Sequence, residues 1–216
     1  MKRFASSALV LISLIGALGA CAPRAASFSD VYDGPVETVA IVMEADEYAH
    51  SQFEDVAYDQ AVTAFYGHPY GRSRFDVVER ERVEAVLDEQ GLVGDGAVDS
   101  GAGPRLGNLL GAQYLVFVEL TNLSADYIDG SGISLGGISL GGGGYRTDAQ
   151  VTLTMIDTET GLIVARSAGQ ANELVGESIS LQGMYATLGD EEGAVLAVLP
   201  RAISAALNDL FISLNS

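Results

Sequence analysis

Hydrophobic and polar residues follow two different periods along the chain, which predicts a mixture of strands and helices. Short β-branched runs bounded by turn residues indicate buried strands, whereas apolar residues spaced three and four apart indicate helices. The predicted strands cover residues 36–45, 74–79, 113–123, 146–157 and 162–170. The predicted helices cover residues 53–66, 81–90, 101–111 and 194–214, and the last should kink or restart at Pro200. Because strands and helices interleave, the sequence predicts an α/β or α+β fold class.

The N-terminal residues predict a targeting signal that is not part of the fold. Two basic residues precede an apolar run over residues 8–18, which is shorter than the about 20 residues of a membrane-spanning helix. The next residues end at Cys21 and resemble the lipobox of bacterial lipoproteins. This resemblance implies a signal peptide over residues 1–20 and covalent lipid, including palmitate, on Cys21. The alternative is an ordinary signal peptide cut after Ala20, which leaves a free cysteine.

The mature chain divides into a tether and one domain. Residues 21–35 are small, polar and aperiodic, which predicts a lipidated tether, and residues 36–216 predict the α/β domain. Ala22 follows the cysteine, and this resembles lipoproteins of the outer membrane. We therefore expect a lipid-anchored protein of the outer membrane whose soluble domain faces the periplasm.

Composition and charge argue against several functions. The 216 residues include 29 Asp and Glu but 11 Lys and Arg, and a net charge of −18 argues against binding nucleic acid. The single cysteine cannot form an internal disulfide or a thiolate metal cluster. His50 and His68 lack the spacing of metal ligands, and we find no nucleophile motif. We therefore expect no catalytic residues, no metal and no cofactor other than the covalent lipid.

A glycine-rich segment over residues 130–144 contains a tandem repeat. Eight of its fifteen residues are glycine, and the sequence Ile-Ser-Leu occurs twice around a Gly-Gly pair. A two-residue turn at Gly136 and Gly137 would pair the two copies, because this turn type needs positive φ at both central residues. Leu135 would then face Ile138, and Ile133 would face Leu140. The four apolar residues would share one face, and the two serines between them would share the other.

The arms of this hairpin have the length of strands that cross a membrane. Each arm can extend over about ten residues, and tilted membrane-spanning strands need about 9–11. Residues 126–147 are therefore a candidate membrane hairpin, with Tyr127 and Tyr145 where an aromatic girdle could lie. Asp129 falls on the apolar side in this register, so a bulge or a position at interfacial depth would be needed. A flexible loop and a water-exposed hairpin remain alternatives.

A second candidate hairpin covers residues 172–190. Ser178, Ser180 and Gln182 alternate with apolar residues or glycine, and a turn near Gln182 and Gly183 would leave arms of about nine residues. The segment also carries two glutamates. A soluble strand and loop is the alternative interpretation.

Several blocks of the domain, taken in order, resemble one family. The strand–helix block over residues 75–90 and the strand that begins at Gly111 resemble the CsgG family of curli production assembly/transport lipoproteins. The glycine-rich hairpin before residues 147–157 and the turn over residues 157–161 resemble the family's next block. Together with the lipobox, the likeness covers most of the mature chain.

The resemblance implies a channel subunit. Each subunit would have a periplasmic α/β domain, and its β-hairpins would form part of an oligomeric transmembrane β-barrel in a ring of identical copies. The expected partners are secreted amyloid-type subunits, either curli-like or holdfast-type adhesins, together with periplasmic accessory proteins. In the family an aromatic-lined constriction follows the first strand, where this chain has Tyr48 and Phe53, although plain packing is an alternative for both. The other hypothesis is a lipid-anchored periplasmic module that regulates a cell-envelope partner without forming a pore.

Overall fold

The computed structural model describes most of the predicted domain. The chain divides into two units, Met1–Asp30 and Val31–Ser216, and all described residues belong to the second. The described residues are 32–44, 51–90, 102–128, 133–135, 138–140, 144–175, 178–181, 184–187 and 191–215.

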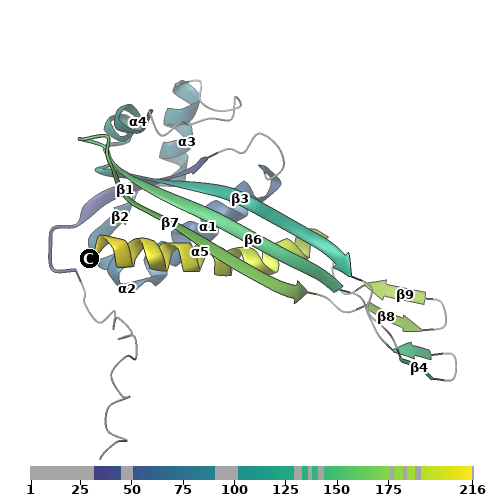
Figure 1. Ribbon diagram of the computed structural model, residues 1–216. Helices are drawn as coiled ribbons and strands as arrows, with labels where there is room; N and C mark the ends of the chain where they lie inside the picture. Colours follow the sequence, from purple (N-terminus) through teal and green to yellow (C-terminus); the bar gives the residue numbers. More distant parts are fainter. Residues whose placement is uncertain are drawn as a thin grey trace, which may run out of the picture. The chain divides into compact units, whose positions relative to one another are not determined.

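Five strands form the main sheet, in the spatial order β2-β1-β3-β6-β7 (Figure 1). The strands are β1 (Glu37–Glu44), β2 (Phe75–Val77), β3 (Tyr114–Ile128), β6 (Gly144–Asp157) and β7 (Ile163–Val175). β1 runs parallel to β2 and β3, whereas β3, β6 and β7 are antiparallel neighbours. All five predicted strands are therefore present, and β3 and β7 each extend five residues beyond their predicted ends.

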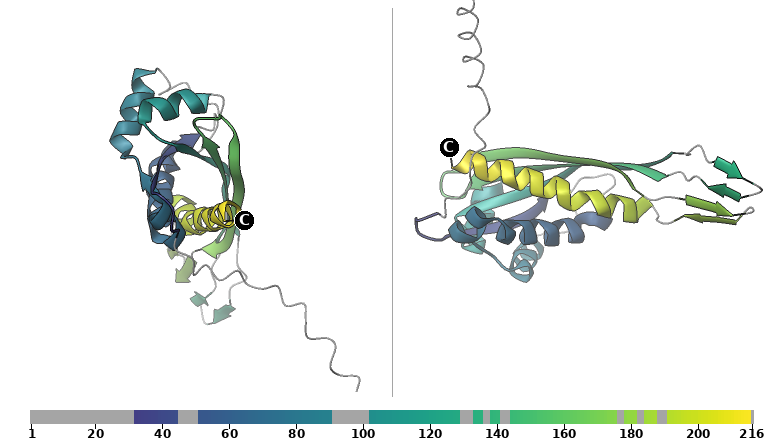
Figure 2. Two further views of the ribbon diagram at one scale, coloured as in Figure 1. Left: turned by 90° about the vertical axis from the view of Figure 1, so that its left-hand side faces the viewer. Right: turned by 90° about the horizontal axis from the view of Figure 1, so that it is seen from below.

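Helices cover both faces of the sheet. They are α1 (Ser51–Gly67), α2 (Pro69–Arg74), α3 (Arg80–Glu89), α4 (Gly103–Leu110) and α5 (Glu191–Leu214). The larger core lies between the sheet and α1 and α5, and it includes Phe65, Leu153 and Phe211. The smaller core lies on the other face under α3 and α4, around Leu106 and Phe117 (Figure 2). The α/β fold class expected from the sequence is confirmed.

The C-terminal helix α5 is continuous through Pro200, so the helix does not restart there. The helix is the only described one that is long and apolar enough to cross a membrane by length and composition. Ten of its residues are buried, however, and nine of these pack in the larger core. Burial on the sheet therefore accounts for its apolar character, and tertiary packing holds the helix together through the proline.

The short helix α2 was not predicted. Pro69 stands near its first turn, and the Nδ1 atom of His68 accepts a hydrogen bond of 3.2 Å from the backbone N–H of Tyr70. Proline at this place and a side-chain acceptor before it are features of a helix N-terminus. With six residues, α2 is too short to show an apolar period, which explains why the sequence pattern missed it.

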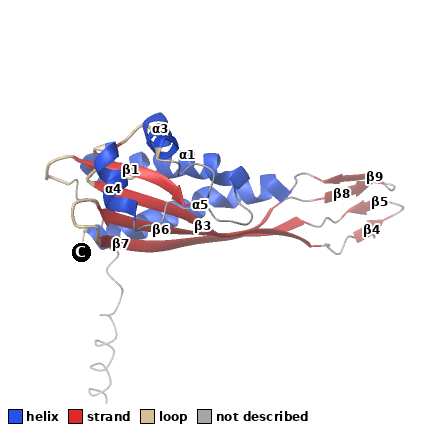
Figure 3. Ribbon diagram, turned by 90° about the horizontal axis from the view of Figure 1, so that it is seen from above, coloured by secondary structure: helices blue, strands red, loops and turns tan. Residues whose placement is uncertain are grey.

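Four short strands form a second sheet, here called the hairpin sheet. They are β4 (Ile133–Leu135), β5 (Ile138–Leu140), β8 (Ser178–Leu181) and β9 (Met184–Thr187), in the order β4-β5-β8-β9. Figure 3 shows this sheet beyond the ends of β3, β6 and β7. The two candidate hairpins, which lie about 40 residues apart in the sequence, are thus neighbours.

Candidate membrane-inserting surface

The first hairpin has the register that the repeat predicts. Ile133 pairs with Leu140, Ser134 with Ser139, and Leu135 with Ile138. This register requires a two-residue connection between β4 and β5, and the sequence supplies Gly136 and Gly137 there, although these two residues lie outside the described ones.

The second hairpin pairs in an equally regular way and joins the first. Leu181 pairs with Met184, which leaves two residues for the connection at the predicted position. On its other side Leu181 pairs with Ile138, so β5 and β8 are antiparallel neighbours. All neighbouring strands of the hairpin sheet are therefore antiparallel.

The combined register separates apolar from polar residues. Directly paired residues lie on the same face of a sheet, and successive residues of a strand lie on opposite faces. One face therefore carries Ile133, Leu135, Ile138, Leu140, Ile179, Leu181, Met184 and Ala186. The opposite face carries Ser134, Ser139, Ser178, Ser180, Tyr185 and Thr187. We call these the apolar face and the hydroxyl face. Such an alternation in all four strands is typical of sheets that contact lipid on one side and water on the other.

A one-residue offset separates the hairpin sheet from the main sheet. Ile128 pairs with Gly144 at the end of β3 and β6, and Ile133 pairs with Leu140 in the hairpin sheet. Four residues, 129–132, connect β3 to β4, whereas three residues, 141–143, connect β5 to β6. The additional residue is one of residues 129–132, which lie outside the described residues, so the bulge expected at Asp129 stays a prediction.

Aromatic residues lie where the hairpins leave the main sheet. Tyr127 and Tyr145 pair directly across β3 and β6, and their rings make an edge contact with centroids 5.5 Å apart. Tyr127 is 48 % exposed although it is a large ring. Tyrosine combines an apolar body with a polar tip, and an interfacial girdle at this pair stays a prediction.

The hairpin sheet has two open edges. Among the described strands, β4 pairs only with β5, and β9 pairs only with β8. Open edges expose unpaired backbone N–H and C=O groups, which cannot remain unpaired in hydrocarbon. The described sheet therefore needs further strands before it can cross a membrane.

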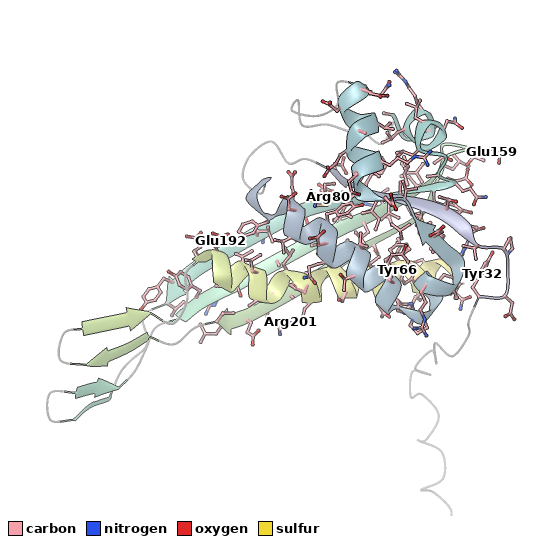
Figure 4. All side chains as sticks on the ribbon, turned by 180° about the vertical axis from the view of Figure 1, so that it is seen from behind. Tyr32, Tyr66, Arg80, Glu159, Glu192 and Arg201 are labelled. Atoms are coloured by element: carbon pink, nitrogen blue, oxygen red, sulfur yellow. The ribbon has the colours of Figure 1, made fainter. Side chains whose placement is uncertain are left out.

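At the opposite end of the domain, an arginine is enclosed by aromatic rings. Arg74 makes an ion pair of 2.6 Å with Glu37, donates a hydrogen bond to the hydroxyl of Tyr70, and stacks near the rings of Tyr32 and Tyr114. Burial by itself lowers the pKa of Arg74, but the hydrogen bonds to Glu37 and Tyr70 outweigh it and raise the pKa. Tyr32 also contacts the ring of Tyr70, so this cluster ties the residues before β1 to α2 (Figure 4).

A second arginine links two helices at the surface. Arg80 on α3 makes ion pairs with Asp55 and Asp59 of α1 and with Glu84 of its own helix (Figure 4). Its hydrogen bonds to Asp55 and Glu84 raise its pKa. This arrangement offsets part of the negative charge of both helices, so it has a structural role.

Of the two residues predicted to line a constriction, Tyr48 and Phe53, the structure describes only Phe53. Tyr48 and the lipid-bearing Cys21 lie outside the described residues. Phe53 is 4 % exposed and packs in the larger core between α1 and the sheet. A buried ring does not line a channel, so the packing alternative holds for Phe53, and the constriction role is corrected for this residue.

The described residues contain no group of three or more His, Cys, Asp or Glu side chains that could hold a metal ion. Within the same residues Asp157 has a structural role, since its carboxylate accepts hydrogen bonds from the backbone N–H and the hydroxyl of Thr160. These bonds lower the pKa of Asp157 and stabilise the turn before β7.

The model of the family described as "Curli production assembly/transport component CsgG" matches residues 43–216. The chain belongs to the CsgG family. Membership makes it a relative of secretion-related lipoproteins of the outer membrane, in agreement with the resemblance found in the sequence. No curated protein sequence matches the chain.

Several solved structures are similar to the chain at low sequence identity. Lipoprotein GNA1162 from Neisseria meningitidis is 11 % identical with a TM-score of 0.46, over 84 % of this chain and 100 % of that one. A dodecameric PelC variant from Paraburkholderia phytofirmans is 10 % identical with a TM-score of 0.39, over 81 % and 95 %. The C-terminal domain of LpoB from Salmonella enterica is 12 % identical with a TM-score of 0.38, over 65 % and 87 %.

Proposed function

We propose that this CsgG family member is a subunit of an outer-membrane secretion channel, anchored by lipid on Cys21, and that it exports curli-like or holdfast-type adhesin subunits. The hairpin sheet supplies four strands to a barrel that identical subunits share. Its apolar face contacts lipid, and its hydroxyl face lines a polar lumen. The observation that carries this proposal is the separation of apolar and hydroxyl residues across all four strands.

The open edges of the hairpin sheet support assembly into a ring. β4 and β9 run in opposite directions, because three antiparallel pairings separate them. When β9 of one subunit lies beside β4 of the next, the new pair is antiparallel like the others. A closed ring of such pairs leaves no unpaired backbone groups in the lipid.

Lumen chemistry and the segment after β1 determine what passes. Serine and threonine hydroxyls offer weak, non-specific hydrogen bonds to an extended chain and no charge to hold it. Tyr48, which follows β1 in the sequence, is the remaining candidate for a constriction, where an aromatic ring would contact the passing chain.

The two faces of one strand pair provide a matched test. The double variant Ile133→Asp/Leu140→Asp places two directly paired carboxylates on the apolar face, and Ser134→Asp/Ser139→Asp places two on the hydroxyl face of the same strands. A basic residue on the lipid face of a barrel costs up to about 2–4 kcal/mol at mid-membrane, and an acidic one less. Repeated around a ring, this cost should abolish insertion of the first variant, while the second should insert.

The measurement is the size of the detergent-extracted particle by electron microscopy, together with resistance of the membrane fraction to urea. Equal assembly of both variants would contradict a lipid-facing role of the apolar face. Absence of any ring in the wild-type protein would favour the other hypothesis, a lipid-anchored module that regulates a cell-envelope partner.

A further inference from the structure

Three strands of the main sheet present a mixed polar and apolar surface where the hairpins begin. Directly paired residues of β3, β6 and β7 share the face of the sheet opposite to α5. Toward the hairpins these rows are Ser124, Asp148 and Asn172, then Asp126, Arg146 and Leu174, and finally Ile128 and Gly144. We call this set of eight residues the root surface.

A cavity of about 520 Å³ lies on the root surface. It is lined by Ile128, Gly144, Arg146, Asp148, Asn172, Glu173 and Leu174. A volume of this size is in the range of about 300–1,000 Å³ that holds a small ligand. The cavity thus combines charged groups with exposed apolar carbon, since Leu174 is 64 % exposed.

The chemistry of the root surface changes along the strands in one direction. The first row is polar, the second combines a carboxylate, a guanidinium and a leucine, and the third is apolar. Leu140 of the apolar face lies four residues before Gly144, and Ile133 lies five residues after Ile128. The apolar row of the root surface is therefore the row nearest to the hairpins in the sequence.

The charges of the root surface match a head group that carries both signs. Arg146 is exposed and pairs directly with Asp126 across the strands, and Asp148 lies two residues along on the same face. An arginine binds a phosphate through two parallel N–H···O bonds. Two carboxylates beside it would repel a purely anionic lipid but would accept hydrogen bonds from an ammonium group.

We propose that the root surface binds the head group of a phospholipid with a phosphate and a primary ammonium, namely phosphatidylethanolamine. Arg146 holds the phosphate, and Asp126 and Asp148 hold the ammonium. Leu174 and Ile128 contact the start of the acyl chains, which continue along the apolar face. The proposal rests on the proposed function, because it requires the hairpins to lie in the membrane, and it places the root surface at the head-group level of the inner leaflet.

The test uses the full-length lipidated protein in vesicles of phosphatidylethanolamine, phosphatidylcholine and phosphatidylglycerol in equal amounts. Lipids that stay bound after mild detergent extraction are counted by native mass spectrometry. Phosphatidylcholine differs at the ammonium, whose methyl groups leave it without N–H donors, and phosphatidylglycerol lacks the cation. We expect phosphatidylethanolamine to be retained about tenfold over both, the size of effect of one charge-assisted hydrogen bond.

Three variants assign the contacts. In Arg146→Gln, the amount of retained phosphatidylethanolamine should fall by about tenfold. Asp126→Asn/Asp148→Asn should retain phosphatidylethanolamine and phosphatidylcholine equally. Arg166→Gln is the matched control, because Arg166 is exposed on the same face of β7 but pairs with Thr154, far along the strand from the root surface. Its lipid retention should equal that of the wild type.

A competition experiment with soluble phosphoethanolamine shows whether the site binds the intact lipid or the free head group. If it displaces the bound lipid at equal concentration, the site recognises the free head group and the lipid assignment is wrong. Equal retention of the three lipids by the wild type, or unchanged retention by Arg146→Gln, would overturn the proposal. Urea extraction distinguishes this failure from that of the proposed function: a protein that resists urea but shows no lipid preference contradicts the lipid site alone.

Discussion

Gly169 in β7 lies close against the backbone of the C-terminal helix α5. A methyl group placed there would lie 2.0 Å from the carbonyl oxygen of Ala202 and 2.4 Å from the backbone nitrogen of Ala206. Both atoms belong to the backbone of α5, so no side-chain rotation can make room. Beside this point the hydroxyl of Ser167 donates a hydrogen bond of 2.7 Å to the carbonyl of Ala206, which ties the helix to the same strand.

The variant Gly169→Ala should therefore destabilise the domain. Ordinary contacts are more than 1 Å longer than these, so α5 must move away from β7 by about 1 Å and loosen its contacts in the larger core. Overpacking of this kind costs about 1–3 kcal/mol or more. Replacing glycine by alanine in a strand also stabilises the fold by up to about 1 kcal/mol, because alanine lowers the conformational entropy of the unfolded chain. We expect a net loss of about 2 kcal/mol, which lowers the melting temperature by about 4–8 °C for a domain of this size.

The matched control is Gly67→Ala at the end of α1. A methyl group at Gly67 would meet no atom within 4 Å, so this variant should be neutral or slightly stabilising. Urea unfolding followed by circular dichroism measures both variants, each in a secreted chain that carries Cys21→Ala to prevent lipidation. A Gly169→Ala midpoint as high as that of Gly67→Ala would refute the inferred contact between β7 and α5.

Three further predictions concern other parts of the chain. Arg74→Met should reduce stability by about 2–4 kcal/mol in urea unfolding, because Glu37 is left without its cation, and adding Glu37→Gln should recover part of the loss. Burial lowers the pKa of His68 from 6.5, so its contribution to stability is present above pH 6.5 and is lost as the pH falls toward the lowered value. His68→Asn keeps an acceptor for the α2 cap and should flatten the dependence of the melting temperature on pH between about 5 and 7. Cys21→Ser should release the protein from lipid anchoring, and mass spectrometry of the wild type should show acyl groups on Cys21; their absence would disprove lipidation.

The hydrophobic pattern of the sequence located most elements of the fold. Runs such as that over residues 113–123 are long and β-branched, and local backbone preference and burial agree on a strand. The Ile-Ser-Leu repeat also predicted the pairing of β4 with β5 residue by residue. Both features depend on residues that are close together in the sequence. Over such short distances, the alternation of side chains and the length of the turn allow few other strand registers.

Tertiary structure decided what depends on residues far apart in the chain. The pairing of Ile138 with Leu181 joins the two hairpins into one sheet, and no local pattern in either hairpin specifies the other as its neighbour. Phe53 is buried because α5, at the far end of the chain, completes the core on that face of the sheet. Asp126 and Arg146 lie 20 residues apart in the sequence, so they became a candidate site only through the register of β3 and β6. The spacing of apolar residues shows which side of a helix or strand is buried. It does not show which other helix or strand covers that side, because this depends on tertiary packing between segments far apart in the chain.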